Sequence, residues 1–388
     1  MTKKSKLNNF LYYFFLILLF DYIFTHFLFK KTSYWTNINK QFSIDKKWRI
    51  KSDLYHHDIA KNIEVVESWG HFNYKLVTNS LGFRDNIQKK ITNVNKIKKR
   101  IYVNGDSFLE GVGYNYEDTA IGILDKKLNN KYEILNSSVT SYSPSIYYTK
   151  TKHYIDKGLK FDFCLTFLDI SDVPDENFIN EDNDGNIYDI RQKKKSKSFK
   201  GKIYKFSNYY KDNFITGRFI FLLREYSSIV KNKYKDKYLA SKKFNKSIFN
   251  ITSEDIDIYK ATHIDRTMWT FDNKYSKRWK KKGLEKSSYY LKKLFQNLKE
   301  QNIDSYLIIY PNPAQIMFNN ENINEIYWEN WSKKNNVKLI SLYKYFDGPD
   351  KKEIIKKYFI NGDVHWNKKG NLLVAESIKK EIFDNFNK

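Results

Sequence analysis

The sequence predicts an α/β fold in which a five-stranded parallel sheet lies between two layers of helices. Three observations predict it. Short apolar runs recur along the chain and lack the alternation of a half-buried strand, as is typical of parallel strands buried on both faces. Amphipathic helical patterns separate these runs. Turn residues follow several of the runs, which favours loops gathered at one edge of the sheet.

Strands and helices are expected to alternate from residue 99 to the C-terminus, with right-handed crossovers. The expected strands lie at 101–103, 132–135, 161–168, 305–310 and 337–342. The expected helices lie at about 118–129, 145–157, 284–301, 322–335 and 368–386. Residues 173–283 interrupt the alternation. We expect them to form an insertion between the third and fourth strands, which serves as a lid or a substrate-binding cap.

An apolar segment near the N-terminus predicts a transmembrane helix, and residues 1–31 are expected to form a signal anchor. Residues 10–29 are nearly all Leu, Ile, Phe and Tyr, and about 20 such residues cross a hydrocarbon core of about 30 Å. The run is long for a signal-peptide core, and no small-residue cleavage site follows it. Asp21 and His26 interrupt the run, and an Asp near mid-membrane costs about 2.5–3.5 kcal/mol. A buried amphipathic helix is the alternative.

Residues 32–98 are expected to form a lead-in segment that packs on the domain formed by residues 99–388. The adjacent His56 and His57 suggest a metal ligand pair at first sight. Neighbouring side chains of a strand point to opposite faces, and no third ligand stands at a suitable spacing. We therefore expect no metal site and no cofactor.

The strongly basic composition invites a nucleic-acid hypothesis, which we do not favour. The formal net charge is +25, but only 8 of the 69 basic residues are Arg, and the lysines are spread along the chain without a binding motif. We expect no nucleic-acid partner, and acidic lipid or anionic polysaccharide suits the charge better. The single cysteine, Cys164, lies in an apolar run, so we expect it to pack in the core. The sequence leaves the oligomeric state open.

Two short motifs carry the candidate chemistry. Gly105-Asp106-Ser107 follows the first expected strand, and Asp363 and His365 precede the last expected helix. A serine hydroxyl is a weak nucleophile until a base takes its proton, and an imidazole suits that task near neutral pH. We predict that Ser107 is the nucleophile, that His365 is its base and that Asp363 orients the imidazole. Asp106 is expected to fix the turn by binding backbone amides.

Both motifs resemble blocks of a known enzyme family. Residues 101–111 resemble the nucleophile block of the SGNH (GDSL) hydrolases, and residues 362–370 resemble the last block of that family. The resemblance covers roughly residues 99–172 and 300–388. It implies a flavodoxin-like three-layer α/β/α sandwich of the SGNH hydrolase type. It also implies hydrolysis of acyl esters by a serine nucleophile, without a cofactor.

The resemblance extends to a lead-in segment and to the oxyanion hole. Asn79 to Asp85 resembles the stretch found ahead of the nucleophile block in some SGNH proteins, and Arg84 is then expected to pair with a carboxylate near the site. A simple turn at Gly82 is the alternative. The family's oxyanion donors are the amide of the serine, a glycine amide and an asparagine side chain. They correspond here to Ser107, Ser138 and Ser171.

Ser138 stands where the family has glycine, and Ser171 stands where it has asparagine. These two replacements argue against efficient hydrolysis, because losing one oxyanion donor lowers the rate about 10²–10³-fold. Asp106, Tyr142, Asp172 and Trp366 are candidates for a substrate pocket, although aromatic residues at such positions also pack in cores. We expect a serine-dependent acyl-ester hydrolase or an O-acyl (acetyl) transferase. Its expected substrate is an acylated carbohydrate or lipid of the cell envelope.

The alternative is a catalytically silent SGNH-like module that binds envelope polysaccharide or an assembly partner. The resemblance places the chain in a bacterial cytoplasmic membrane by a single-pass helix, with its body on the extracytoplasmic side. Lysines flank both ends of the apolar run, so charge gives little information about orientation.

Overall fold

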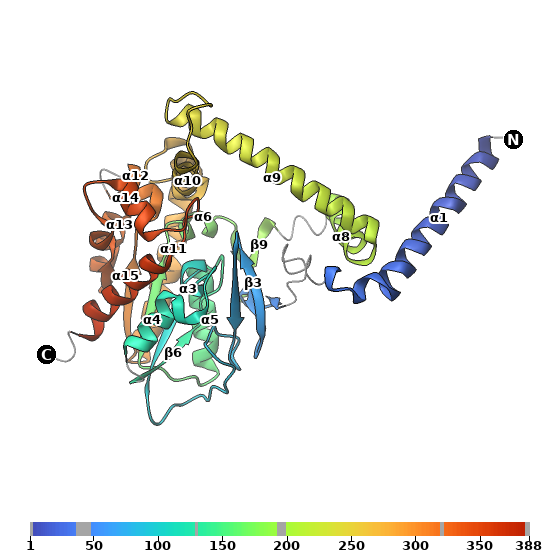
Figure 1. Cartoon of the computed structure of the whole chain (residues 1–388). Coiled ribbons are helices and arrows are strands. Elements are labelled where there is room, and N and C mark those ends of the chain that lie inside the picture. The colour runs from blue at the N-terminus through green and yellow to red at the C-terminus, as the bar shows by residue number, and fades with distance from the viewer. Residues whose placement is uncertain (1–2, 36–47, 129–130, 192–198, 319–321, 385–388) are drawn as a thin grey trace. The chain divides into compact units, whose positions relative to one another are not determined.

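The computed structural model describes residues 3–35, 48–128, 131–191, 199–318 and 322–384, which are shown as ribbons in Figure 1. Its chain forms two compact units. Unit 1 consists of Met1–Asp45 and Arg191–Asn250, and unit 2 consists of Lys46–Ile190 and Ile251–Lys388. The expected interruption at 173–283 is therefore divided between the units, because only its middle part belongs to unit 1.

Unit 2 is built on a five-stranded parallel sheet with the order β11-β10-β7-β5-β6. Read across the sheet from β6 to β11, the strands are the second, first, third, fourth and fifth of this sheet along the chain. This is the flavodoxin-like arrangement that the sequence predicts. The strands of this sheet are β5 (Lys99–Asn104), β6 (Tyr132–Asn136), β7 (Phe163–Leu168), β10 (Asp304–Ile309) and β11 (Lys338–Ser341). Every residue of β7 is buried, as expected for a central strand with helices on both faces.

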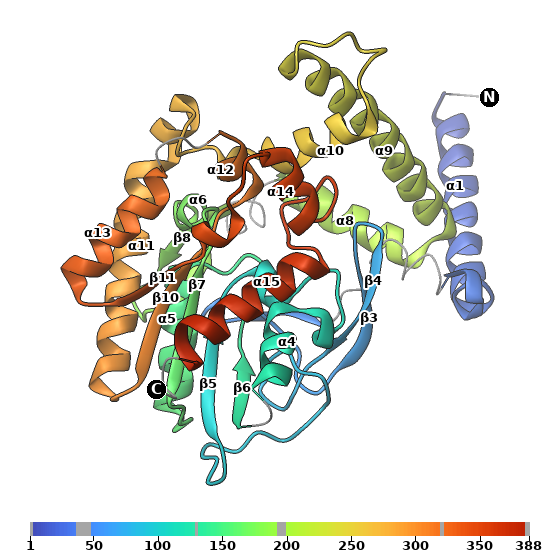
Figure 2. The same ribbon diagram turned by 60° about the vertical axis from the view of Figure 1, so that its left-hand side comes forward.

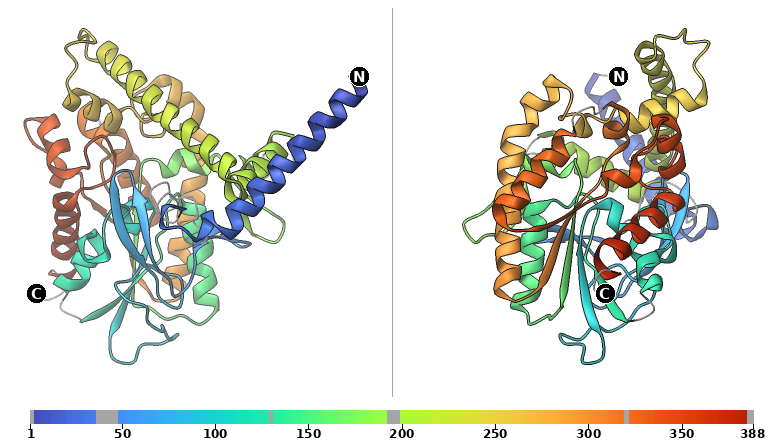
Figure 3. Two further views of the ribbon diagram at one scale, coloured as in Figure 1. Left: turned by 45° about the vertical axis from the view of Figure 1, so that its right-hand side comes forward. Right: turned by 90° about the vertical axis from the view of Figure 1, so that its left-hand side faces the viewer.

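Helices cover both faces of the sheet, so the predicted three-layer sandwich is confirmed. Helices α4 and α15 pack together on one face, and α5 and α11 pack together on the other, as Figure 2 and the right panel of Figure 3 show. The α-helices of unit 2 are α3 (Ser107–Glu110), α4 (Ala120–Lys127), α5 (Pro144–Asp156), α6 (Asp172–Glu176), α10 (Ser253–Thr262), α11 (Asn273–Glu300), α12 (Pro313–Phe318), α13 (Ile323–Asn335), α14 (Lys351–Tyr358) and α15 (Lys368–Ile378). Short helical turns complete them: η2 (Tyr116–Asp118), η3 (Asp265–Thr267), η4 (Tyr343–Phe346) and the π-turn η5 (Lys379–Phe383).

Local chemistry fixes where the long helices begin. The side chain of Thr119 accepts from the amide of Gly122 and starts α4, and Asn367 accepts from the amides of Lys369 and Gly370 and starts α15. The hydrophobic core of this unit contains three buried tryptophans, Trp269, Trp328 and Trp331. The core thus keeps the carboxyl ends of the strands, and the loops that follow them, in fixed positions.

Three antiparallel strand pairs stand beside the main sheet in unit 2. Two pairs lie within the lead-in segment, β1 (Arg49–Ser52) with β2 (His56–Ile59) and β3 (Glu64–Trp69) with β4 (Phe72–Val77). The third pair, β8 (Ile179–Glu181) with β9 (Ile187–Asp189), belongs to the first part of the insertion. An isolated bridge between Arg84 and Asn136 joins the lead-in segment to the end of β6.

Two expectations about the lead-in segment are wrong. Arg84 pairs with no carboxylate among the described residues. Its buried guanidinium donates instead to the carbonyl oxygens of Glu110, Gly111 and Tyr114, which follow the nucleophile turn. The rings of His56 and His57 do not point to opposite faces. Their Nδ1 atoms lie 2.5 Å apart, because His56 has a φ of 78° and leaves the extended conformation.

Unit 1 consists of helices from two distant parts of the chain. They are α1 (Lys3–Phe27), the short η1 (Phe29–Lys31), α8 (Phe199–Asn213) and α9 (Ile215–Lys243). Residues Asn8–Lys31 are long and apolar enough to cross a membrane by length and composition, and an N-terminal signal sequence passes the same test. The described part of α1 is mostly exposed, with Asp21 and Thr25 as its buried polar residues.

Candidate active site

The nucleophile turn lies directly after β5. Ser107 is the first residue of α3, and the Oδ1 atom of Asp106 caps this short helix by accepting from the amide of Phe108 at 3.0 Å. Gly105 allows the helix to fold back closely, since a Cβ there would lie 2.7 Å from the side chain of Leu109. The predicted role of Asp106 in fixing the turn agrees with this contact.

The acid and the imidazole lie in a tight loop between α14 and α15. An isolated bridge between Phe359 and Trp366 closes this loop, and Gly362 adopts a φ of 71° that favours glycine. The Oδ1 atom of Asp363 accepts from the amide of His365 at 3.0 Å and lies 2.5 Å from the ring atom Nδ1. One carboxylate oxygen therefore orients both the backbone and the ring of the histidine.

Serine and histidine meet at the carboxyl edge of the sheet. The Nε2 atom of His365 lies 2.8 Å from the Oγ atom of Ser107. Because Nδ1 donates to the Asp363 carboxylate, Nε2 of a neutral ring is the acceptor, and the serine hydroxyl donates to it. A second acceptor, Oδ2 of Asp106, lies at 3.4 Å from the same hydroxyl. The three predicted residues thus form one hydrogen-bonded chain with the polarity that deprotonation of serine requires.

A residue of the lead-in segment completes this chain, and the sequence analysis missed it. Trp69 ends β3, and its Nε1 donates to the Oδ2 atom of Asp363 at 2.9 Å. Its ring meets the ring of His365 edge to face, with centroids 4.9 Å apart. Burial acts to raise the pKa of Asp363, but the hydrogen bonds and charge of His365 and the bond from Trp69 hold this pKa well below its usual range. No spacing rule points to Trp69, because it comes from a hairpin outside the motif blocks.

The loop after β6 corrects the expected position of one oxyanion donor. Ser138 is buried outside the cavity, and its amide donates to Oδ1 of Asn136 at 3.2 Å. Ser141 lines the cavity instead, with a φ of 66°, and its amide has no acceptor among the described residues. The left-handed conformation at Ser141 is the one that glycine adopts most easily.

Glu110 of α3 holds this loop in place. Its carboxylate accepts from the amide and the hydroxyl of Thr140, at 2.7 and 2.8 Å, and from the guanidinium of Arg49 at 2.8 and 2.5 Å. Burial acts to raise the pKa of Glu110, yet Arg49 lowers it to about 2. The buried carboxylate therefore stays ionised and ties the loop next to Ser141 to the nucleophile helix.

The loop after β7 corrects two further expectations. The amide and the hydroxyl of Ser171 both donate to Oδ2 of Asp169, so its one hydroxyl proton is already used within the loop. Asp172 does not line the cavity. Its Oδ2 accepts from the hydroxyl of Tyr147 at 2.9 Å and from the amide of Asp169 at 3.1 Å. Neither residue has the role that the resemblance implies for it.

Asn312 supplies an amide side chain where Ser171 does not. It follows β10, lies fully buried and lines the cavity, and its Nδ2 donates to Oδ1 of Asp169 at 3.2 Å. An Nδ2 group carries two hydrogens, so one remains for another acceptor. Pro311 and Pro313 flank Asn312 in the sequence and predict a loop there, but they do not predict a hydrogen-bond donor.

Three buried carboxyl groups lie side by side beneath the serine. One oxygen from each of Asp106, Asp169 and Asp172 lies within 4.8 Å of the others. Burial and the neighbouring Asp169 raise the pKa of Asp106 from 3.8 to about 7, and burial with Asp106 and Asp169 raises that of Asp172. Asp169 accepts hydrogen bonds from Ser171 and Asn312. Both raised pKa values favour the protonated forms of Asp106 and Asp172.

The two aromatic pocket candidates are core residues. Tyr142 is 1% exposed and donates its hydroxyl to the carbonyl of His57 at 2.8 Å. Trp366 is 2% exposed and packs against Phe108 and Tyr310, with ring centroids 4.9 and 4.8 Å away. Both stabilise loops of the site without reaching its cavity.

The cavity over Ser107 has a volume of about 230 Å³ and is lined by both polar and apolar groups. The insertion contributes Asp175 and Arg266, which pair at 2.7 Å. Few of its lining side chains are large and apolar. The lining residues are Trp69, Asp106, Ser107, Phe108, Thr140, Ser141, Asp169, Ser171, Asp175, Ile264, Arg266, Thr267, Asn312, Gly362, Asp363, Val364 and His365.

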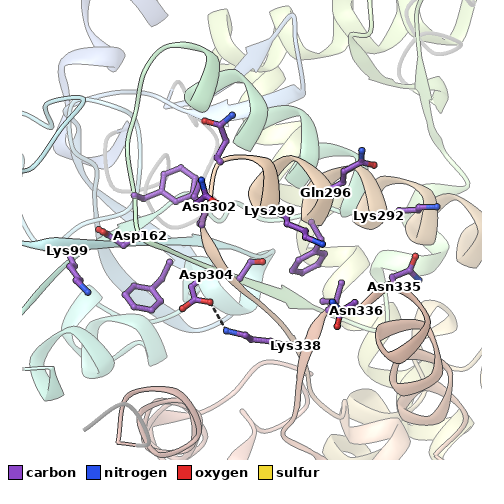
Figure 4. A pocket seen from close by; sticks show the side chains of 17 residues that line it. Lys99, Asp162, Lys292, Gln296, Lys299, Asn302, Asp304, Asn335, Asn336 and Lys338 are labelled. Atoms are coloured by element: carbon purple, nitrogen blue, oxygen red, sulfur yellow. Dashed lines mark hydrogen bonds and ion pairs between the residues drawn. The ribbon is translucent and has the colours of Figure 1, made fainter.

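A larger cavity of about 860 Å³ opens where the strands of the sheet begin (Figure 4). Its labelled lysines and amides come from α11, the end of α13, the loops after these helices and the starts of the strands, and Lys338 pairs with Asp304 at 2.6 Å. Its described lining contains no histidine that could serve as a base. Size therefore does not identify the reactive site, and the cavity over Ser107 remains the candidate.

No known protein family matches the sequence as a whole, and neither does any curated protein. The chain is similar in structure to a psychrotrophic esterase, EstA, from Pseudoalteromonas, with 11% identity, a TM-score of 0.37 and coverage of 75% of this chain and 100% of that one. It is similar to a G-D-S-L family lipolytic protein from Veillonella parvula at 12% identity and a TM-score of 0.34, covering 74% and 98%. It is similar to a catalytic mutant of an acetylxylan esterase from Geobacillus stearothermophilus at 10% identity and a TM-score of 0.37, covering 75% and 97%.

The G-D-S-L family named among these structures is the family that the nucleophile block of this chain resembles. With TM-scores below 0.5, these similarities alone establish neither activity nor substrate.

The raised pKa of Asp106 gives a prediction for stability. The unfolded chain releases this proton near pH 4 and the folded chain near pH 7, so the folded state binds more protons between these values. Asp106 therefore contributes less stability as the pH rises from 4 to 7. Asp106→Asn keeps an oxygen for the helix cap, and its Tm in mild detergent should rise relative to that of the wild-type chain over this range, which changes the slope of Tm against pH.

Asp184→Asn, in the exposed turn between β8 and β9, is the matched control and should leave the slope unchanged. Parallel Tm curves for wild type and Asp106→Asn would contradict the assignment of the proton to the carboxyl cluster.

Proposed function

We propose that this protein is a serine-dependent acyl-ester hydrolase or O-acyl transferase, a divergent relative of the SGNH hydrolases. The contact of Ser107 Oγ with His365 Nε2 at 2.8 Å, with Asp363 behind the ring, carries the proposal. A buried serine, a buried imidazole and a half-buried carboxylate in this order match the geometry by which serine esterases are recognised.

The reaction begins when Ser107 Oγ attacks the ester carbonyl and its proton passes to Nε2 of His365. The carbonyl oxygen becomes an oxyanion, and Asp363 stabilises the imidazolium. The imidazolium then protonates the leaving alkoxide, which departs as an alcohol and leaves an acyl-serine. Water or a sugar hydroxyl gives a proton to His365 and attacks the acyl carbon. Collapse of the second oxyanion releases the acid or the new ester and returns the proton to Ser107.

The oxyanion hole in this proposal differs from the one that the resemblance implies. The amides of Ser107 and Ser141 and the second hydrogen on Nδ2 of Asn312 are the donors we assign. All three residues line the cavity, and neither amide donates to another described residue. In this proposal the side chain of Asn312 donates to the oxyanion in place of Ser171, and the amide of Ser141 donates in place of that of Ser138.

The cavity favours a short acyl group. A volume of about 230 Å³ accommodates an acetyl group and part of its alcohol, and it leaves little room for a long acyl chain. We propose an acetylated carbohydrate or lipid of the cell envelope as the substrate class. Hydrolysis and transfer differ only in the second acceptor, and a sugar added to an acetyl-ester assay separates them.

We propose a membrane location for this chemistry. The length and composition of Asn8–Lys31 support a spanning helix. In this proposal α1 is an uncleaved single-pass anchor, and the body of the chain lies on the extracytoplasmic side. The substrate would then be reached at the membrane surface. A silent module that binds polysaccharide is the competing function, and the following experiment separates the two.

The first prediction concerns the serine. A fluorophosphonate should label the full chain at Ser107, and cleavage of a chromogenic acetyl ester should fall at least 10³-fold in Ser107→Ala, because no other group supplies the nucleophile. Ser228→Ala, on the exposed face of α9, is the control. A silent module would show neither labelling nor a difference between these variants.

The second prediction concerns the indole of Trp69. Trp69→Phe removes the donor to Asp363 and should lower kcat about 10-fold with little change in KM, because orientation of the base is lost while substrate contacts remain. The acid limb of the rate profile should move to higher pH, since a less neutralised carboxylate holds the imidazolium proton more strongly.

Trp48→Phe is the matched control. Trp48 also donates its Nε1 to a carboxylate, that of Glu67 at 3.1 Å, but not to the Ser107 site. Equal effects of the two substitutions, without a shift in the profile, would mean that Trp69 is only structural.

The third prediction concerns the oxyanion hole. Asn312→Ala should lower kcat about 10²-fold with KM little changed, because one donor to the oxyanion is lost. Ser171→Ala should have a much smaller effect, because its hydroxyl proton is used by Asp169. Steady-state kinetics on the acetyl ester would measure both, and the reverse order of effects would support the donor set that the resemblance implies.

A further inference from the structure

Within unit 1, the acidic residue of the apolar helix caps another helix. Asp21 is 5% exposed, and its carboxylate accepts from the amides of Ile215 and Thr216 at 2.9 and 3.3 Å and from the hydroxyl of Thr216. Ile215 is the first residue of α9, and the residue before it, Phe214, provides no side-chain cap. Asp21 thus satisfies amides that the start of α9 leaves open and faces the positive end of its dipole.

Further contacts fix the corner between α8 and α9 beside the same stretch of α1, and Figure 3 shows this corner next to the blue helix. The rings of Tyr22 and Phe214 lie 5.6 Å apart, and Lys30 donates to Asn213 at 3.3 Å. Asp21 precedes Phe29, at the end of the apolar run, by about 12 Å of helix rise. A spanning α1 would therefore hold the start of α9 inside the apolar layer.

The exposed surface beside this corner is apolar. Its side chains on α9 recur every three or four residues, which places them on one stripe of the helix. The stripe consists of Phe219, Ile220, Leu223, Tyr226, Ile229 and Val230, all at least 38% exposed. The exposed large side chains of α8 are Ile203, Tyr204, Phe206 and Tyr209. Monomeric proteins in water rarely leave so much contiguous apolar surface uncovered.

The character of α9 changes after the stripe. Lys231, Lys233, Lys235 and Lys237 follow it on the same helix. Residues 215–230 are about 24 Å long and carry Arg218, Arg224 and Glu225 besides the stripe, whereas lysines dominate the second half of the helix and suit it to water. Tyrosines and lysines beside an apolar stripe are typical of helices that lie in a membrane interface.

We propose that the α8–α9 corner and the apolar stripe of α9 are embedded in lipid beside α1, so that this chain holds the bilayer by two elements. The inference rests on the proposed anchoring by α1 and adds a second contact. Lipid suits the stripe because the stripe begins one turn after the corner that contacts α1, and the apolar side chains of α1 are themselves exposed. The capping of α9 by Asp21 supplies hydrogen bonds that offset the cost of a carboxylate at that depth.

Nitroxide depth measurements on the full chain in lipid nanodiscs test this proposal. The single Cys164 is replaced by Ala, and single labels are placed at Phe219, Leu223 and, as the control on the same helix, Lys235. At each label we compare the collision rate with oxygen, which concentrates in lipid, with the collision rate with a water-soluble nickel chelate. The ratio of oxygen to chelate collisions should be at least several-fold higher at 219 and 223 than at 235. Equal access of the chelate to all three would overturn the proposal.

A label at Ile17 of α1 separates this inference from the anchor itself. If the label at 17 is shielded from the chelate and the label at 219 is accessible to it, α1 is still an anchor but the second membrane contact is rejected. If the chelate reaches the label at 17, the anchor itself is rejected. A second copy of the chain on the stripe would instead give low access to both reagents at 223 and label-to-label distances under about 20 Å between molecules, which would also reject lipid as the occupant.

The capping contact has its own test. Asp21→Leu should speed hydrogen exchange at the amides of Ile215 and Thr216 at least 10-fold, while Asp21→Asn, which keeps an acceptor oxygen, should have a smaller effect. Unchanged exchange in Asp21→Leu would mean that Asp21 does not hold the start of α9 in the bilayer.

Discussion

The hydrogen bond between Ser107 and His365 joins residues that are 258 positions apart, and it depends on the common direction of the strands. In a parallel sheet all carboxyl ends lie on one edge, so the loops after β5, β6, β7 and β10 meet above the same point. Ser107, Ser141, Asp169 and Asn312 come from these four loops. The loop with His365 then has to reach only that one edge, and a tight turn with glycine at 362 presents the imidazole there.

The sequence predicts this framework because burial on both faces leaves a plain apolar signal in each strand. All five strands of the sheet lie within a few residues of the predicted ranges. Ser107, Asp363 and His365 could also be predicted, since each stands next to a turn or a helix start that the sequence marks. Ser138 and Ser171 could not be assigned correctly. Their roles depend on loop conformation, and the left-handed residue of the first loop is Ser141, a type that gives no warning of a positive φ.

Asn312 and Trp69 are site residues that no pattern in the sequence predicts. Asn312 replaces the missing amide from a different strand, so no alignment of the β7 loop points to it. Trp69 comes from a hairpin that precedes the sheet in the chain, and only tertiary packing brings its indole to Asp363. Arg84 and Arg49 act in the same way, since their guanidinium groups fix the carbonyls after α3 and the carboxylate of Glu110. The lead-in segment is therefore part of the machinery that holds the site.

Unit 1 is assembled from residues before and far beyond the lead-in segment, and this order has a consequence for biogenesis. A ribosome releases α1 some 190 residues ahead of α9, the partner that receives the Asp21 carboxylate. During that interval the hydrogen-bond donor that α1 itself provides to the carboxylate is the hydroxyl of Thr25. The newly made α1 therefore lacks the donors that stabilise its carboxylate while the first part of unit 2 is synthesised. These donors become available only after residues 215 and 216 have been translated.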